Sequence, residues 1–231
     1  MFLRAALLDA PPHPAWLRDL AVVRALAAGP LEFTTPVTVI SGENGAGKST
    51  LVEALAVGSG FNAEGGSRHA RMRVEQDSVS PLHEVLTLRR RNAPDGFFLR
   101  GESFYNLAGW YAGLDDSPLP DLLEMSHGES LMAVIRRRFH GGGLFFLDEP
   151  EAGLSNLRQL ELLGRLRHLA DRGSQIILAT HSPILLAIPG ARILEVDSAG
   201  IHERTLEDTE AFRAAREFTA DPTGTAEYLT S

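Results

Sequence analysis

The sequence contains no cysteine. This absence excludes disulfide bonds, thiol catalysis and zinc sites built from thiolates, and it agrees with a reducing compartment. Long apolar runs are missing as well, because no stretch approaches the roughly 18 uninterrupted apolar residues of a membrane-spanning helix. The apolar start of the chain is interrupted by Asp9 and the prolines after it, too early for a secretory signal. We therefore expect a cytoplasmic protein without direct membrane insertion.

The sequence also has fewer positively charged than negatively charged residues. The 231 residues include 22 Lys and Arg against 30 Asp and Glu, which gives a net charge of −8. This balance disfavours broad, charge-driven binding of nucleic acid, so DNA stays an open partner that the net charge does not support. Three local basic clusters are interpreted as solvated faces, although Arg71 and Arg73 would share one face of a strand. The clusters are Arg68/Arg71/Arg73, residues 89–91 and residues 136–138.

What the sequence does contain is the pattern of an α/β protein. Its 44% apolar and 23% charged residues are ordinary for a soluble globular chain, and its length suits one large domain. Four short runs, apolar on both faces, predict strands of a central, mainly parallel sheet flanked by helices. Leucines at positions 157, 160, 163, 166 and 169 predict one stripe of a helix. The runs cover residues 37–40, 144–147, 176–179 and 193–196, and the helices cover residues 48–57 and 156–172.

The middle of the chain has a different character, with a glycine-rich stretch and a strong turn signal at Pro94-Asp95-Gly96. Two apolar segments around that turn predict a β-hairpin. We therefore predict a single domain over residues 1–231, with a mixed and largely helical sub-domain inserted at about residues 58–140. Its predicted parts are a loop at residues 58–68, hairpin strands at 85–91 and 97–100, and helices at 105–114 and 131–139.

The segment Gly42-x-x-x-x-Gly47-Lys48-Ser49 follows an apolar strand and opens a helix. Glycines let backbone N–H groups converge on phosphate oxygens without Cβ clashes, and the helix N-terminus adds its positive dipole end. Lys48 is expected to reach the β- and γ-phosphates, and Ser49 to ligate Mg²⁺. We interpret the segment as a nucleotide-binding P-loop rather than a structural turn. The expected nucleotide contacts come from Gly42, Glu43, Asn44, Gly45, Ala46, Gly47, Lys48, Ser49 and Thr50.

The segment FFLDEPEAG, residues 145–153, ends an apolar strand with two adjacent carboxylates. Open α/β sheets bind ligands at the carboxyl ends of their strands. Asp148 is expected to hold Mg²⁺, usually through water, while Glu149 orients and deprotonates the attacking water. Taken alone, an acidic strand end before Pro150 is more often structural. Its occurrence in one chain with a P-loop favours the catalytic interpretation.

Two shorter segments leave alternatives open. Ser126-x-x-Glu129 predicts a helix capping box, and the same geometry would let Ser126 and Gly128 grip a terminal phosphate. His181 follows another apolar strand and can donate a hydrogen bond to a γ-phosphate. A lone histidine at a strand end is usually an ordinary polar residue. The presence of the other motifs in the same chain favours the functional interpretation of His181.

Together these segments resemble the ATP-binding cassette (ABC) ATPases. The order is P-loop, MSHGE at the signature position, FFLDEP as Walker B, EAGLS as the D-loop and His181 as the switch histidine. GENG and THSP are similar to the soluble branch, which includes the structural-maintenance-of-chromosomes heads, RecF and the overcoming-lysogenization-defect nucleases. FNAEGGSR and SHGES are similar to small stand-alone bacterial ATPases. In this alignment His127 replaces the first signature glycine, Glu102 stands for the Q-loop glutamine, and Trp16 or Phe33 stacks on adenine.

The resemblance implies a P-loop NTPase fold of the ABC-head type, with ATP and Mg²⁺ as cofactors. It implies ATP hydrolysis with Lys48, Glu149 and His181 as catalytic groups. It further implies an ATP-dependent homodimer in which Ser126 and Gly128 of one copy contact the nucleotide held by the other. Hydrolysis would separate the copies and drive an unknown protein partner in DNA maintenance or defence. Two alternatives stay open: the ATP-binding subunit of an ABC transporter, and a nucleotide-dependent switch that does not hydrolyse ATP.

Overall fold

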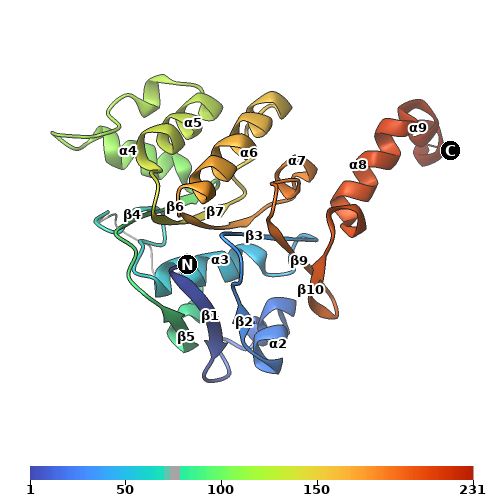
Figure 1. Cartoon of the computed structure of the whole chain (residues 1–231), viewed down its shortest axis with the longest axis horizontal. Coiled ribbons are helices and arrows are strands. Elements are labelled where there is room, and N and C mark those ends of the chain that lie inside the picture. Colours follow the sequence, from blue (N-terminus) through green and yellow to red (C-terminus); the bar gives the residue numbers. More distant parts are fainter. Residues whose placement is uncertain (71, 73–78, 231) are drawn as a thin grey trace.

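The computed structural model describes residues 1–70, 72 and 79–230, so Arg71 and Arg73 of the first basic cluster lie outside the described residues. A seven-stranded sheet in the order β10-β9-β3-β8-β7-β6-β4 crosses the molecule (Figure 1). The strands from β9 to β6 are parallel to their neighbours, and β10 and β4 join the two edges in antiparallel fashion. The bounds are β3 (Val37–Gly42), β4 (Gly66–Ser67), β6 (Asp95–Arg100), β7 (Gly143–Asp148), β8 (Gln175–Ala179), β9 (Arg192–Asp197) and β10 (Gly200–Arg204).

All four apolar runs of the sequence form central strands of this sheet, each slightly longer than predicted. Successive residues of a strand point to opposite faces of the sheet, so the side chains of these strands pack alternately into two hydrophobic cores, one on each face. In β7, Phe145 and Leu147 pack into one core, while Leu144 and Phe146 pack into the other. The predicted α/β class, with a mainly parallel sheet between helical layers, is confirmed.

Helices cover both faces of the sheet (Figure 1). One core joins the sheet to α2, α3 and a small second sheet, and the other joins it to α4, α5, α6 and α7. The helices predicted at residues 48–57, 105–114, 131–139 and 156–172 correspond to α3, α4, α5 and α6. The bounds are α1 (Trp16–Asp19), α2 (Ala21–Ala28), α3 (Lys48–Gly58), α4 (Phe104–Ala112), α5 (His127–Arg138), α6 (Asn156–Asp171) and α7 (Pro183–Leu186), with short 3₁₀ turns at Pro81–Val85, Leu122–Glu124 and Leu206–Asp208.

The predicted hairpin in the middle of the chain is wrong. The small second sheet has the order β2 (Leu31–Glu32), β1 (Leu3–Leu8) and β5 (Leu86–Arg90), so the first hairpin strand pairs with β1. The second strand, β6, lies parallel to β7 in the central sheet. Burial explains the separation, because β6 is buried along most of its length whereas β5 is half-exposed. The range 58–140 as an inserted sub-domain stays a prediction, and it includes this strand of the main sheet.

The leucine stripe predicted for α6 is partly wrong. Leu166 and Leu169 are buried as expected, but Leu157 and Leu160 are exposed. Leu162, which the stripe left out, is fully buried. The buried face of α6 therefore follows the i, i+4, i+7 spacing of an amphipathic helix rather than a strict three-residue repeat.

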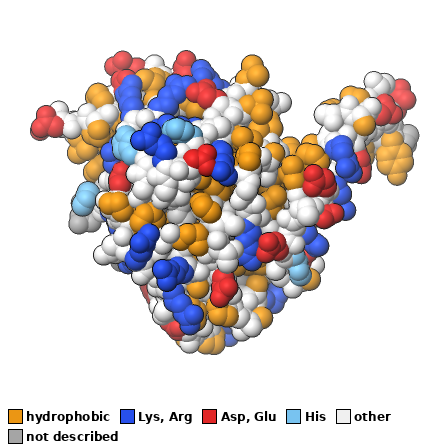
Figure 2. Space-filling model, in the orientation of Figure 1, with side chains coloured by type: hydrophobic (Ala, Val, Ile, Leu, Met, Phe, Trp, Pro, Cys, Tyr) orange, Lys and Arg blue, Asp and Glu red, His pale blue; other side chains and the backbone are white. Residues whose placement is uncertain are grey.

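The last two helices, α8 (Glu210–Ala220) and α9 (Pro222–Thr230), extend from the body as an arm (Figure 1). Neither helix contains a buried residue. Apolar side chains on the arm, including Phe218 and Leu229, are more than half exposed (Figure 2). Among the described residues, no helix is long and apolar enough to cross a membrane.

Candidate functional site

The P-loop connects the central strand β3 to the helix α3. Its residues 43–45 are exposed, so the backbone of the loop is open to a ligand. Gly42 and Gly47 have left-handed backbones, with φ of 128° and 94°. A Cβ on Gly42 would lie 2.1 Å from the Val196 carbonyl oxygen, and one on Gly47 would lie 2.7 Å from Val22 Cγ2. Both positions therefore require glycine, for the backbone angle and for the space.

Lys48 begins α3 and is the only lysine of the chain. Its side chain bends back over the loop, where Nζ donates to the carbonyl oxygens of Gly42 at 2.8 Å and Glu43 at 2.7 Å. The residue is only 4% exposed. Burial lowers the pKa of Lys48, and the carboxylates of Glu149 and Asp148 oppose that shift. The ammonium group is thus held at the mouth of the loop.

Asp148 ends β7 and is 5% exposed. Burial raises its pKa from 3.8 to about 6, while the Ser49 side chain and Arg100 act in the opposite direction. Its Oδ1 atom is buried and finds no hydrogen-bond partner among the residues that the structure describes. An orphaned carboxylate oxygen beside a hydroxyl is a donor set that suits Mg²⁺, which prefers oxygen ligands. Ser49 and Asp148 therefore fit the metal that the sequence predicted for them.

Glu149 follows Asp148 with a left-handed backbone, φ 47°, which is uncommon outside glycine. Its N–H donates to the carbonyl oxygen of Ala179 at 3.0 Å, which fixes the peptide at the end of β8. The side chain is about half exposed, and its Oε1 lies 3.6 Å from His181 Nε2. The peptide N–H of His181 donates to Glu151 Oε1 at 2.7 Å. The predicted base and the predicted switch histidine therefore lie side by side.

The sheet order explains why these side chains meet. Strands β3, β8 and β7 are adjacent and parallel, and their carboxyl ends carry the P-loop, His181 and Asp148. Residues about a hundred positions apart in the chain are thereby brought to one edge. The buried Nε2 of His181 and Oε2 of Glu151 also lack hydrogen-bond partners within the described part of the chain. This end of the sheet therefore carries three buried polar atoms without hydrogen-bond partners among the described residues: Asp148 Oδ1, Glu151 Oε2 and His181 Nε2.

Ser126 and Gly128 lie at the start of α5, where the predicted capping box is confirmed. Ser126 Oγ accepts from the Glu129 N–H at 3.4 Å, and Glu129 Oε2 accepts from the Ser126 N–H at 3.1 Å. The ring of His127, between them, lies 5.2 Å from that of Phe104. Across the described residues, no hydrogen bond or ion pair joins Ser126 or Gly128 to the P-loop. The role of these two residues at a phosphate stays a prediction.

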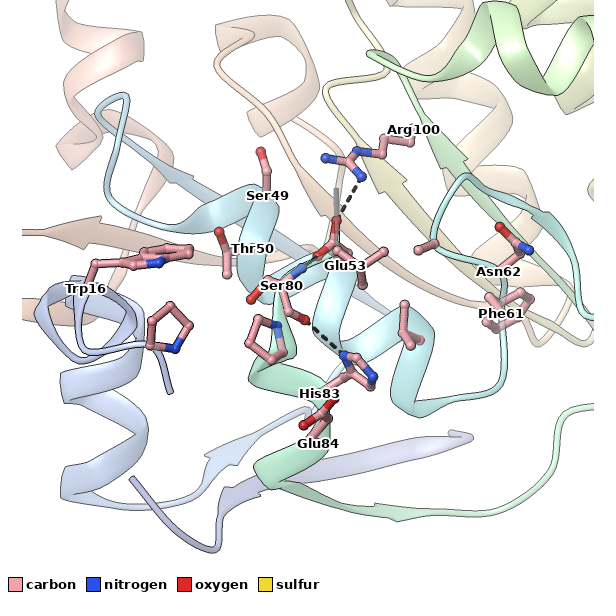
Figure 3. Close-up of a pocket in the computed structure, with 15 residues that line it drawn as sticks. Trp16, Ser49, Thr50, Glu53, Phe61, Asn62, Ser80, His83, Glu84 and Arg100 are labelled. Atoms are coloured by element: carbon pink, nitrogen blue, oxygen red, sulfur yellow. Dashed lines mark hydrogen bonds and ion pairs between the residues drawn. The ribbon is translucent and has the colours of Figure 1, made fainter. Parts of the chain in front are cut away.

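A cavity of about 930 Å³ opens beside the first turn of α3 (Figure 3). Trp16 lines it together with Ser49 and Thr50, and this side chain is 52% exposed. Phe33, the other predicted adenine-stacking residue, is 2% exposed in the core under α2 and α3. Its ring has no free face, so this prediction is wrong. Trp16 is left as the candidate, because its ring stands at the rim of the cavity.

Arg100 and Glu53 also line this cavity, and neither was predicted from the sequence (Figure 3). Arg100 ends β6, the strand next to Asp148, and Glu53 lies on α3. Arg100 Nη1 lies 2.8 Å from Glu53 Oε2, and its Nη2 lies 3.3 Å from Glu102 Oε2. Arg100 reaches the cavity because β6 pairs with β7. The sequence pattern predicted a hairpin for β6 instead, so it did not predict this position of Arg100.

Two family models match the chain: "AAA domain, putative AbiEii toxin, Type IV TA system" over residues 121–187, and "AAA domain" over residues 23–87. The cytochrome c biogenesis ATP-binding export protein CcmA of Rhizobium meliloti is 31% identical over 196 residues, 74% of this chain and 86% of that protein. The DNA repair protein RecN of Xylella fastidiosa is 38% identical over 85 residues, 35% of this chain and 15% of that protein. A solved structure, "An inward-facing conformation of a putative metal-chelate type ABC transporter", has a TM-score of 0.53 at 15% identity and covers 94% of this chain and 90% of that one.

Proposed function

The chain belongs to the ABC class of P-loop ATPases, and on that premise we propose that it binds ATP with Mg²⁺ and hydrolyses ATP between two copies arranged head to tail. One observation carries the proposal. Lys48, Asp148 and His181 meet at the carboxyl ends of three adjacent parallel strands, and two of them present buried polar atoms without partners in the described chain. Such an edge is where open α/β sheets bind nucleotides.

Each residue has a role that its position supports. The ammonium group of Lys48 leaves the loop carbonyls and binds the β- and γ-phosphates. Ser49 and Asp148 hold Mg²⁺, which neutralises phosphate charge when bound. Glu149 accepts the proton of the attacking water, and His181 beside it donates a hydrogen bond to the γ-phosphate. Trp16, at the rim of the adjoining cavity, stacks on the base.

The second copy completes the site. The N-terminus of α5 presents Ser126, exposed, with Gly128 in the first turn of the helix. A helix N-terminus of this kind attracts phosphate, and a head-to-tail arrangement would bring it to the nucleotide held by the other copy. Hydrolysis then removes the γ-phosphate that joins the copies, and their separation moves a protein partner in the cytoplasm.

The substitution Glu149→Gln tests this proposal. Glutamine keeps the size of the side chain but cannot accept the proton, so turnover should fall by at least about 100-fold. Affinity for ATP should be retained, and a dimer should accumulate with ATP and Mg²⁺ in analytical ultracentrifugation. Glu161→Gln, a partly exposed carboxylate on α6, is the control and should leave turnover unchanged. A Glu149→Gln protein that stays monomeric with ATP and Mg²⁺ would contradict the dimer.

Two settings for this ATPase have separate support. The match to RecN, whose name states DNA repair, favours an ATPase in DNA maintenance or defence. The match to CcmA, an ATP-binding export protein, spans most of both chains and favours the ATP-binding subunit of a transporter. ATPase rates with and without double-stranded DNA, at low and at physiological salt, separate the two. Stimulation that fades with salt favours the first setting. Indifference to DNA together with binding to a membrane-embedded partner favours the second.

A further inference from the structure

Arg100 lies at the end of β6, directly opposite Asp148 across the β6–β7 ladder. The Arg100 side chain is 15% exposed and is surrounded by three carboxylates. Nη1 contacts Glu53, Nη2 contacts Glu102, and Nε lies 3.9 Å from Asp148 Oδ2. One planar guanidinium group thus faces a residue of α3, a residue after β6 and the predicted metal ligand at the same time.

Glu53 fixes the position of this guanidinium group (Figure 3). Its side chain is 4% exposed, and it lies on α3 just after the residues that hold phosphate and metal. While Oε2 accepts from Arg100, Oε1 accepts from the Ser80 N–H at 2.8 Å. Both oxygens of the buried carboxylate are therefore occupied. Glu53 holds Arg100 from one side, and Arg100 faces Asp148 on the other.

The contact between Arg100 and Asp148 is incomplete, in contrast to the contact with Glu53. Arg100 Nε and Asp148 Oδ1 are both buried, and neither has a hydrogen-bond partner within the described residues. A buried charge pair at 3.9 Å is a poor source of stability, because desolvation offsets its attraction. The Arg100–Asp148 pair is better explained by an effect of Arg100 on the orientation of the Asp148 carboxylate. Groups behind a metal ligand orient that ligand, and their loss typically lowers metal affinity by about 10- to 100-fold.

We propose that Arg100 is a positioning residue for the metal site: held by Glu53, it orients the Asp148 carboxylate toward Ser49 and so links the P-loop helix to the strand that carries the metal ligand. This role rests on the proposed function, because it presupposes that Asp148 and Ser49 hold Mg²⁺ with the nucleotide. Glu102, whose side chain is 84% exposed, contacts the same guanidinium group from the solvent side.

The direction in which cation affinity changes when Arg100 is removed distinguishes a positioning role from simple electrostatic repulsion. Arg100 is a cation close to the metal site, so its removal should strengthen cation binding if Coulomb repulsion were its main influence. If Arg100 orients the ligand, its removal should weaken cation binding instead. Lysine keeps the charge but lacks the planar fork, so Arg100→Lys should restore little of the loss.

The experiment measures Mn²⁺ binding by electron paramagnetic resonance, in the presence of a non-hydrolysable ATP analogue. We expect Arg100→Ala and Glu53→Gln to weaken Mn²⁺ affinity by about tenfold or more. Nucleotide affinity without divalent cations should change less than about twofold, because the phosphate contacts of the P-loop are untouched. Arg192→Ala is the matched control, because Arg192 is 19% exposed and ion-paired to Glu203 at 2.9 Å, yet it lies at the other end of a central strand.

The outcomes are distinct. An Arg100→Ala protein whose Mn²⁺ affinity equals that of Arg192→Ala, or exceeds that of the wild type, overturns the positioning role. A wild-type protein that binds no Mn²⁺ with the nucleotide analogue overturns the proposed function itself. If Arg100→Ala fails to fold, Glu53→Gln decides by the same comparison with Arg192→Ala. Glu53→Gln keeps the size of the side chain, removes the charge and replaces one of the two acceptor oxygens that hold Arg100 and the Ser80 N–H.

Discussion

The two halves of the proposed nucleotide site are built in opposite ways. The half at the carboxyl edge of the sheet, with the P-loop, Asp148 and His181, leaves buried polar atoms without partners among the described residues. The half at the start of α5 satisfies its own polar groups, because Ser126 and Glu129 bond each other reciprocally. A ligand at the first half would satisfy buried polar atoms, whereas a phosphate at the second half would gain only the exposed helix N-terminus.

This difference indicates how the halves divide the work. A buried polar atom without a partner costs about 1–3 kcal/mol, so a ligand that pairs these atoms would recover that free energy at the half proposed to hold phosphate and metal. The capping box is stable when empty, and a phosphate must be brought to it. A second copy that carries its own nucleotide could do so.

The largest expected effect is a change in the free energy of unfolding when Asp148 is replaced. Its pKa is raised from 3.8 to about 6 in the folded chain, so the folded state binds the proton more tightly than the unfolded state. The free energy of unfolding should therefore fall as the pH rises from about 4 to about 6. An asparagine side chain carries no charge at any of these pH values, so Asp148→Asn should remove this slope and raise stability at pH 7 by about 2–3 kcal/mol. Urea unfolding of both proteins without Mg²⁺ or nucleotide measures the difference; parallel pH profiles would contradict it.

The next effect is expected at Lys48. Charge-assisted hydrogen bonds contribute about 1.5–3 kcal/mol, so Lys48→Ala should weaken ATP binding by roughly 10- to 100-fold. Titration with a fluorescent ATP analogue measures the loss. Lys48→Arg is the companion variant, since it keeps the charge in a shape that does not fit the loop carbonyls. ATP affinity that survives Lys48→Ala would remove the basis for treating the sheet edge as the nucleotide half.

The smallest effect is expected when Ser126 is replaced. Two variants of this residue distinguish its role as a helix cap from its proposed contact with phosphate. Ser126→Ala removes a helix cap and should lower the free energy of unfolding by about 1 kcal/mol. Ser126→Asp keeps a good cap but places a negative charge where the phosphate is proposed to bind. In the Glu149→Gln background, both variants should weaken the ATP-dependent dimer and leave ATP affinity of the monomer unchanged. If Ser126→Asp dimerises normally, the residue is only a cap and the two halves are unrelated.

The sequence predicted well where one residue type serves both local structure and chemistry. The glycines of the P-loop, the apolar runs before it and before Asp148, and the capping box at Ser126 are local patterns. Each predicted its element, and the parallel sheet then brought Lys48, Asp148 and His181 to one edge. The α/β class followed from the same runs.

The errors arose where pairing between distant segments decides the outcome. Phe97–Leu99 is buried on both faces, a sign of a central strand, but the nearby turn favoured a hairpin instead. The missed contact of Arg100 with Glu53 followed directly from that error. Phe33 and Trp16 could not be told apart, since only the packing under α2 covers one and leaves the other at a cavity.

The position of Lys48 has a chemical consequence. The chain has one ε-amino group, and that group lies in the P-loop, where it donates to the carbonyl oxygens of Gly42 and Glu43. An acylating reagent that is selective for amines can therefore modify only Lys48 and the α-amino group. Any modification of a lysine side chain in this protein is therefore a modification of its P-loop.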